Sequence, residues 1–155
     1  RSVAGTYKYC LAEYMKVFKG RQSDPLASLM LGITYVHMAC QKFSADKNAL
    51  VKQAWVFLNS YLELRGESQE TFYNIGRAMH QLSINPQAMY YYEKALEFPA
   101  LPSAPGQPSL DLSKEIAFNL ALIYKKSCPA MSRYYIRKFI SNLFRNFYFK
   151  FIINL

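Results

Sequence analysis

Side chains that could carry out chemistry are few in this chain of 155 residues. Its two histidines are His37 and His80, and Cys40 follows His37 by three residues, so these two could share one face of a helix. A structural zinc site needs four ligands, usually in two close pairs, and the sequence has no second pair. No glycine-rich phosphate loop and no nucleophile, histidine and carboxylate grouping occurs. We therefore expect no enzyme, no metal, no cofactor and no small-molecule substrate.

The remaining candidates recur at helical spacing, which favours binding over catalysis. Tyr73, Asn74, Arg77 and His80 fall on one side of a predicted helix at 70–82. Two further predicted helices, at 26–38 and 114–126, offer matching positions that are apolar in the first and mixed in the second. The predicted protein-binding residues are Leu29, Met30, Ile33, Tyr73, Asn74, Arg77, His80, Phe118, Asn119 and Leu122. The alternative is that these side chains only pack one repeat on the next.

The elements that position these residues are organised around one stretch, QETFYNIGRAMHQLSINPQAMYYYEKALEFPA at 69–100. Counted from Gln69, it has Phe72 at position 4, Gly76 at 8, Ala88 at 20 and Tyr92 at 24, as in the tetratricopeptide (TPR) repeat. Two antiparallel helices approach closely only where one side chain nearly vanishes, so the small residues should face large ones. The plainer alternative is an ordinary pair of amphipathic helices.

Copies of this pattern occur on both sides of the central stretch. LASLMLGITY and EIAFNLALIY repeat its first helix, and GTYKYCLAEYMKVF resembles a second helix whose first helix is missing. We therefore predict an all-α, TPR-like solenoid of antiparallel helix pairs with about three and a half repeats, a fragment of a longer array. The predicted domains are TPR-like repeats at 1–128, with a proline-rich insertion at 99–109, and a divergent basic, aromatic-rich C-terminal helix or tail at 129–155.

The proline-rich insertion has prolines at 99, 102, 105 and 108, a period of three that suits a polyproline II segment. It could be a ligand for an SH3 or WW domain, but it lacks most of the flanking basic and aromatic residues. A flexible linker is the favoured interpretation. Ser109 or Asp111 is expected to cap the helix that follows, with Glu115 in its first turn.

Hydrophobic content of 52% suffices for a continuous core, and the three cysteines fit a reducing compartment. We expect Cys10, Cys40 and Cys128 to behave as small buried apolar residues.

The net charge of +9 comes almost wholly from the C-terminal forty residues. Residues 1–115 contain twelve basic and ten acidic side chains, whereas residues 116–155 contain seven basic side chains and no acidic one. Ile136, Phe139, Ile140, Leu143, Phe144 and Phe147 form one predicted helical face. We expect this face to dock on the preceding helix. The alternative is nucleic-acid or anionic-membrane binding by the basic tail, although the apolar run is too short and too charged for a transmembrane span.

One family resembles the chain over roughly residues 5–128. LASLMLGITYVHMACQKF, the stretch NALVKQAWVFLNSYLELRGESQETFYNIGRAMHQL, AMYYYEKALE and DLSKEIAFNLALIY together resemble the C-terminal TPR array of the TPR subunit of general transcription factor IIIC. FLNSYLELRG running directly into QETFYNIGRAMHQL is the specific part. The chain departs from the family pattern after Cys128, because Arg133 and Arg137 stand where small and aromatic buried residues are expected.

The resemblance implies a protein–protein interaction scaffold in the nucleus. The factor binds internal promoters of tRNA-type genes for RNA polymerase III, and its TPR subunit recruits transcription factor IIIB through the Brf and Bdp components. Expected partners are therefore transcription factor IIIB components and other transcription factor IIIC subunits. DNA would be reached indirectly through the complex, and no membrane is expected.

Overall fold

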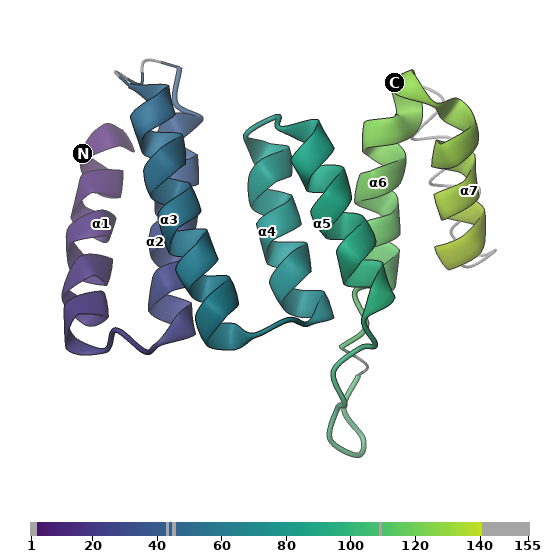
Figure 1. Cartoon of the computed structure of the whole chain (residues 1–155), viewed down its shortest axis with the longest axis horizontal. Helices are drawn as coiled ribbons and strands as arrows, with labels where there is room; N and C mark the ends of the chain where they lie inside the picture. Colours follow the sequence, from purple (N-terminus) through teal and green to yellow (C-terminus); the bar gives the residue numbers. More distant parts are fainter. Residues whose placement is uncertain (1–2, 43, 45, 109, 141–155) are drawn as a thin grey trace. The chain divides into compact units, whose positions relative to one another are not determined.

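The computed structural model describes residues 3–42, 44, 46–108 and 110–140, and this part of the chain is helical without strands (Figure 1). The all-α prediction is confirmed. Helices α1, α2 and α3 reverse direction in turn, and so do α5, α6 and α7 (Figure 1). The predicted helices at 26–38, 70–82 and 114–126 agree with α2, α4 and α6 to within one residue at each end. The helices are α1 Val3–Gly20, α2 Pro25–Ala39, α3 Lys47–Arg65, α4 Gln69–Gln81, α5 Asn85–Glu97, α6 Ser113–Ser127 and α7 Pro129–Phe139.

These helices fall into two compact units, each of which is described by itself. Unit 1 comprises Arg1–Glu67 with Arg77–Ile84, and unit 2 comprises Ser68–Gly76 with Asn85–Leu155. The boundary lies inside α4. The predicted domain division at residue 128 follows sequence divergence and stays a prediction.

Polar side chains start several of the helices. Asp24 accepts a hydrogen bond from the Leu26 amide at 2.9 Å, and Pro25 occupies the first turn of α2, where its missing N–H costs nothing. Asp46 accepts from the Ala49 amide at 3.0 Å in the same way at α3. Each cap satisfies a donor that the helix itself leaves unpaired.

The N-cap of α6 is Leu112, not Asp111 or Ser109 as predicted, and Leu112 has no side-chain group that could cap the helix. Asp111, one residue earlier, nevertheless satisfies an amide of the first turn. The Asp111 carboxylate accepts from the Ser113 amide at 3.0 Å, and Glu115 lies in the first turn as predicted. Ser109 lies outside the described residues. Helix α7 follows almost without a connection, because Cys128 ends α6 and Pro129 opens α7.

The predicted contact of a small residue with a large one is present in unit 1. A Cβ atom added to Gly32 would lie 2.9 Å from the Leu58 side chain, so α2 and α3 meet where Gly32 has no side chain. Leu58 and Ala54 are fully buried. Close approach of these helices thus depends on the glycine, as the repeat pattern predicts.

The same contact closes the central helix pair in unit 2. A Cβ atom on Gly76 would lie 2.7 Å from Cδ1 of Tyr92. Tyr92, Ala88 and Ala95 of α5 are fully buried, as is nearly all of Phe72 on α4. The predicted positions 4, 8, 20 and 24 of the central stretch are therefore the packed ones.

The pair α6–α7 packs in the same way, but the buried large residue of its second helix comes one residue earlier than in the central pair. Tyr92 follows Gly76 by sixteen residues, whereas the buried Ile136 follows Ala121 by fifteen. Ser132, also buried, donates a hydrogen bond to the Ala121 carbonyl oxygen at 2.8 Å. Arg133 and Arg137, which the strict repeat spacing would place inside, are exposed. Helix α7 thus docks on α6 as predicted, although Leu143, Phe144 and Phe147 of the predicted apolar face lie outside the described residues.

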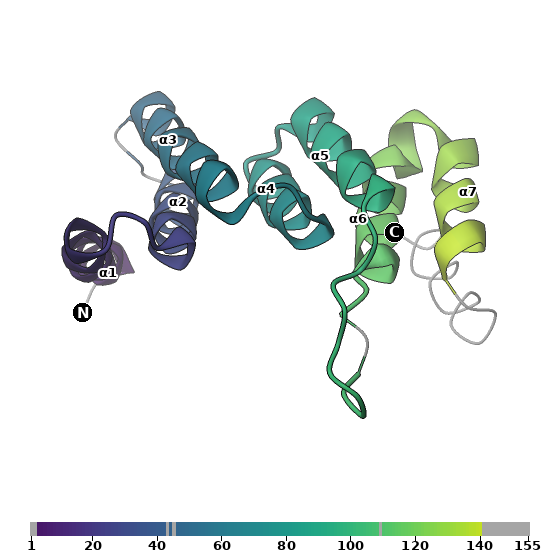
Figure 2. The same cartoon turned by 60° about the horizontal axis from the view of Figure 1, so that its bottom comes forward.

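The proline-rich insertion extends away from α5 and α6, as both views show (Figures 1 and 2). Its described residues from 101 to 108 are exposed and belong to no helix. Both of its ends are held by the buried side chain of Gln69 at the start of α4. The Gln69 amide oxygen accepts from the Leu112 amide at 2.8 Å, and its nitrogen donates to Asp111 at 3.3 Å and to the Phe98 carbonyl at 3.5 Å.

The expectation of three buried cysteines is wrong. Cys40 is exposed, and Cys10 and Cys128 are half-buried. Two of them stand at helix ends, where the chain turns and side chains are less covered: Cys40 caps α2 and Cys128 caps α6.

Candidate functional site

The ten predicted binding residues lie on α2, α4 and α6, and none of them belongs to the buried core. Arg77 is exposed and the other nine are half-buried. Half-buried side chains are not part of the interior and are not fully exposed to water. This degree of exposure suits residues that contact a binding partner. The half-buried nine are Leu29, Met30, Ile33, Tyr73, Asn74, His80, Phe118, Asn119 and Leu122.

Helix α4 divides its residues cleanly between core and surface. Phe72, Ile75 and Met79 are at most 4% exposed, whereas Arg77 lies open to solvent. Asn74 lies between these extremes. The predicted stripe of binding residues is therefore the side of α4 that the core leaves uncovered.

Tyr73 contributes to packing as well as to this surface. Its ring centroid lies 6.2 Å from that of Tyr92, with the rings tilted by 39°. Tilted aromatic pairs at this separation are mutually stabilising. A change at Tyr73 would therefore disturb both the surface and the Gly76–Tyr92 contact.

The end of α4 lies in unit 1 and carries His80, the histidine of the predicted site. Burial, and to a lesser extent the charge of neighbouring Arg77, lower the pKa of His80 below its ordinary value. The ring is therefore neutral at neutral pH. Just beyond it, Ser83 has a φ of +60°, and the Ile84 amide donates to the Met79 carbonyl at 3.0 Å, which closes the helix with a left-handed turn.

The α2 residues of the predicted site lie on a helix that is held from two sides within unit 1. Ser28 shares a hydrogen bond with Ser60 of α3 at 3.2 Å. His37 instead meets Tyr7 of α1, with ring centroids 6.0 Å apart. This contact gives His37 a packing role.

The α6 residues of the predicted site lie beside a fully buried row of the same helix. Ile116, Ala117, Leu120 and Ala121 are all completely buried, which leaves the half-exposed positions on the adjoining side. The predicted site is thus distributed over both units, and the continuous groove stays a prediction.

Two features of unit 2 were not predicted from the sequence. One is the set of hydrogen bonds by which Gln69 holds both ends of the proline-rich insertion, here called the Gln69 clamp, which no local sequence pattern indicates. The other is Glu93, whose carboxylate accepts from the hydroxyls of Tyr124 at 3.0 Å and Tyr135 at 3.2 Å. Burial, and then the nearby Glu93 charge, raise the pKa of Tyr135 well above its ordinary value. These bonds join α5 to α6 and α7.

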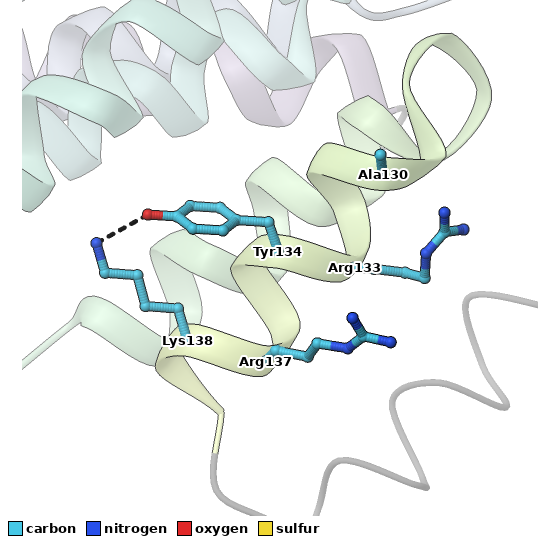
Figure 3. A pocket seen from close by; sticks show the side chains of 5 residues that line it. All are labelled: Ala130, Arg133, Tyr134, Arg137 and Lys138. Carbon is cyan, nitrogen blue, oxygen red and sulfur yellow. Dashed lines mark hydrogen bonds between the residues drawn. The ribbon is translucent and has the colours of Figure 1, made fainter.

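A shallow surface depression of about 400 Å³ lies on the outer side of α7 (Figure 3). Its lining residues were recognised in sequence only as part of a basic tail, without a pocket. In the described ranges no three side chains of the kinds that bind metals come together, and no helix there is long and apolar enough to cross a bilayer. The depression is lined by Ala130, Arg133, Tyr134, Arg137 and Lys138.

Comparison with known proteins gives three relatives, and no protein-family model matches the chain. Human general transcription factor 3C polypeptide 3 is 45% identical over 126 residues, covering 81% of this chain. Transcription factor tau subunit sfc4 of Schizosaccharomyces pombe is 32% identical over 124 residues, or 72% of the chain. The transcription factor tau 131 kDa subunit of Saccharomyces cerevisiae is 29% identical over 110 residues, or 67% of the chain.

The matched segment is a small part of each relative. It spans 14% of the human protein, 12% of the fission yeast protein and 10% of the budding yeast protein. The similarity nevertheless covers most of the helices described above, and it agrees with the resemblance detected in the repeat sequences. The chain therefore belongs to the family of transcription factor IIIC subunits that includes these three proteins.

Proposed function

We propose that this chain is a non-catalytic scaffold of the RNA polymerase III transcription apparatus in the nucleus. On this proposal it binds a protein segment from transcription factor IIIB or from a neighbouring transcription factor IIIC subunit. Two observations support it together: the chain belongs to a family of transcription factor IIIC subunits, and its ten candidate residues all lie outside the buried core. The second observation carries the choice of surface.

The composition of that surface indicates the kind of ligand. Leu29, Met30 and Ile33 on α2 are apolar, whereas Asn74 and Arg77 on α4 are polar or basic. A helical or extended segment with apolar anchors and at least one acidic residue would complement both parts. A ligand that offers only a terminal carboxylate would leave the apolar residues unused.

Individual roles follow from side-chain chemistry. Tyr73 would supply an aromatic anchor, since tyrosine and arginine dominate the binding energy of many interfaces. Arg77 would pair with an acidic residue of the ligand, and its fork of donors suits a carboxylate. Asn74 and Asn119 would hold the ligand backbone, because each amide both donates and accepts.

The test uses a variant that spares the core. Arg77→Glu with Asn119→Ala changes one exposed and one half-buried residue, whereas Tyr73→Ala would also disturb Tyr92. We expect capture of purified transcription factor IIIB components or neighbouring subunits to weaken by about 30-fold or more, because a like charge would face the acidic ligand residue. The melting temperature should stay unchanged.

The matched control is Lys52→Glu, which makes the same charge reversal at an exposed position of α3 outside the predicted site. It should retain capture. Equal loss in both variants would show a general charge effect and reject the site, and full capture by the Arg77→Glu, Asn119→Ala variant would reject it as well.

A further inference from the structure

The outer face of α7 collects positive charge that the described part of the chain does not pair with acidic residues. Arg133, Tyr134, Arg137 and Lys138 line the shallow depression there, and all four are exposed (Figure 3). Packing against α6 is supplied by the other side of the helix, where Ser132, Tyr135 and Ile136 are buried. Among the described residues, the packing of α7 on α6 therefore does not use these cations.

These cations have no acidic counterpart nearby in the sequence. Residues 116–155 contain no aspartate or glutamate. Among the described residues, neither the Arg133 nor the Arg137 guanidinium has a hydrogen-bond partner or an ion pair. The carboxylate that does reach α7 is that of Glu93, and it accepts from Tyr135 on the packed side. Two like charges one helical turn apart repel each other, so an external anion would relieve an existing cost.

The two arginines are arranged as a pair. Their side chains extend from α7 in the same direction, while Tyr134 and Lys138 extend to the other side (Figure 3). Four residues of helix advance about 6 Å, so the pair offers two cationic forks at a regular interval. Guanidinium groups bind phosphate oxygens in two-pronged fashion, and a nucleic-acid strand presents phosphates repetitively.

The contacts that Tyr134 already makes bear on whether the ligand is double-stranded or single-stranded. Proteins that bind single strands stack bases on free aromatic faces. The Lys138 ammonium, however, donates to the Tyr134 hydroxyl at 2.9 Å and lies 5.3 Å from the centre of its ring. The Tyr135 ring meets the same ring edge-on, with centroids 5.2 Å apart. Tyr134 thus holds a lysine in position, and although the residue is 44% exposed, a base stacking on it would compete with its contacts to Lys138 and Tyr135.

We propose that the outward face of α7 binds the phosphate backbone of double-stranded DNA without reading its sequence, with Arg133 and Arg137 as the principal contacts and Lys138 in support. Charge complementarity and the contacts that Tyr134 already makes with Lys138 and Tyr135 favour this ligand. A DNA-contacting surface is also compatible with a family whose members are named as transcription factors. The proposal is independent of the protein-binding surface on α2, α4 and α6.

The experiment measures binding of the 155-residue chain to a fluorescent random-sequence duplex by anisotropy across about 50–200 mM salt. Arg133→Gln with Arg137→Gln should lower affinity at least tenfold at about 100 mM salt and flatten the salt dependence by about 1.8 in log–log slope, the value for two lost phosphate contacts. Both residues are exposed, so the melting temperature should not change.

The matched control, Lys47→Gln with Lys52→Gln, removes the same charge from exposed positions of α3 and should change affinity less than twofold. The proposal is overturned if both variants lose affinity equally, or if the arginine variant binds duplex as the unmodified chain does. It is also overturned if a single strand of equal length binds tenfold more tightly than the duplex. Arginine-dependent binding of phosphatidylserine vesicles or of a poly-glutamate peptide without duplex binding would overturn it too, in favour of a membrane or protein partner.

Discussion

Helices α4 and α7 are similar on the side that packs in the core, here called the inner face. They differ in composition on the side that the core leaves uncovered, here called the outer face. On α4 the uncovered residues are mixed, since Tyr73, Asn74 and the neutral His80 share the helix with one cation, Arg77, and one acid, Glu70. The outer face of α7 instead combines three cations with one tyrosine. The first composition suits a protein segment with apolar and acidic residues, and the second suits a polyanion.

The inner faces explain why such different surfaces can share one architecture. Gly76 admits the Tyr92 ring, and Ala121 takes the corresponding place in α6, where its carbonyl oxygen accepts from Ser132 of α7. A small residue opposite a larger one is enough to bring the two helices together. The outer residues can then differ, because most core positions and most uncovered positions of each helix are separate. Tyr73 is an exception, since its ring also meets that of Tyr92.

The largest effect should come from the inner face of either pair. Tyr92→Ala is expected to cost about 3–5 kcal/mol and Ile136→Ala about 2–5 kcal/mol in unfolding free energy, because both side chains are fully buried and would leave cavities. Arg137→Ala should stay within about 0.5 kcal/mol. Chemical denaturation monitored by circular dichroism measures all three. Similar losses for Ile136→Ala and Arg137→Ala would mean that the register assigned to α7 is wrong.

Gly76→Ala should give the next largest effect, about 1–3 kcal/mol of destabilisation. The new Cβ would lie 2.7 Å from the Tyr92 ring, which is itself enclosed and cannot move aside freely. Gly20→Ala is the control, since nothing lies within 4 Å of a Cβ there. It should be neutral or stabilising by up to about 1 kcal/mol. Equal stability of the two variants would show that α4 and α5 do not depend on the glycine.

Ser83→Gly should stabilise the chain by up to about 1 kcal/mol, because Ser83 has a φ of +60° that glycine adopts at little cost. The backbone bonds that close α4 need no side chain and would remain. Ser127→Gly, the same change at a helical position of α6, should lose about 0.5 kcal/mol instead. A loss in both variants would argue that the left-handed turn after α4 is not strained.

The smallest effect should be a pH dependence from His80. Its pKa is lowered in the folded chain, so folding favours the neutral ring. The resulting stability is complete above the ordinary histidine pKa of about 6.5 and is lost as the pH falls through the lowered value. Thermal melts between about pH 7.5 and 5 should show this decline, and His80→Gln should flatten it. An unchanged decline in the variant would assign it to other groups.

Much of this fold could be predicted because the repeat pattern depends on residue size. Gly32, Gly76 and Ala121 mark the places where helices approach. A buried large residue follows 16 residues later in α4–α5 and 15 later in α6–α7, but 26 later in α2–α3, where the connection between the helices is longer. Local signals such as Asp24 before Pro25 fix helix starts independently of any repeat. The bounds of α2, α4 and α6 are therefore predictable from the sequence to within one residue.

Features that depend on contacts distant in the sequence could not be predicted. The one-residue displacement of α7 follows from Cys128 serving both α6 and α7, which no composition reveals. The Gln69 clamp joins residues more than forty positions apart, and its glutamine looks like any polar helix start. The candidate surface was predictable as uncovered positions, whereas its partner was suggested by the family resemblance alone.

The most direct test asks whether the predicted protein-binding surface and the outer face of α7 bind different ligands. It measures the binding of two ligands by two variants. Binding of a transcription factor IIIB component and of random-sequence duplex DNA is measured for Arg77→Glu with Asn119→Ala and for Arg133→Gln with Arg137→Gln. The first variant should lose the protein and keep the DNA, and the second should lose the DNA and keep the protein. Loss of both ligands in either variant, or of neither in both, would contradict separate protein-binding and DNA-binding faces.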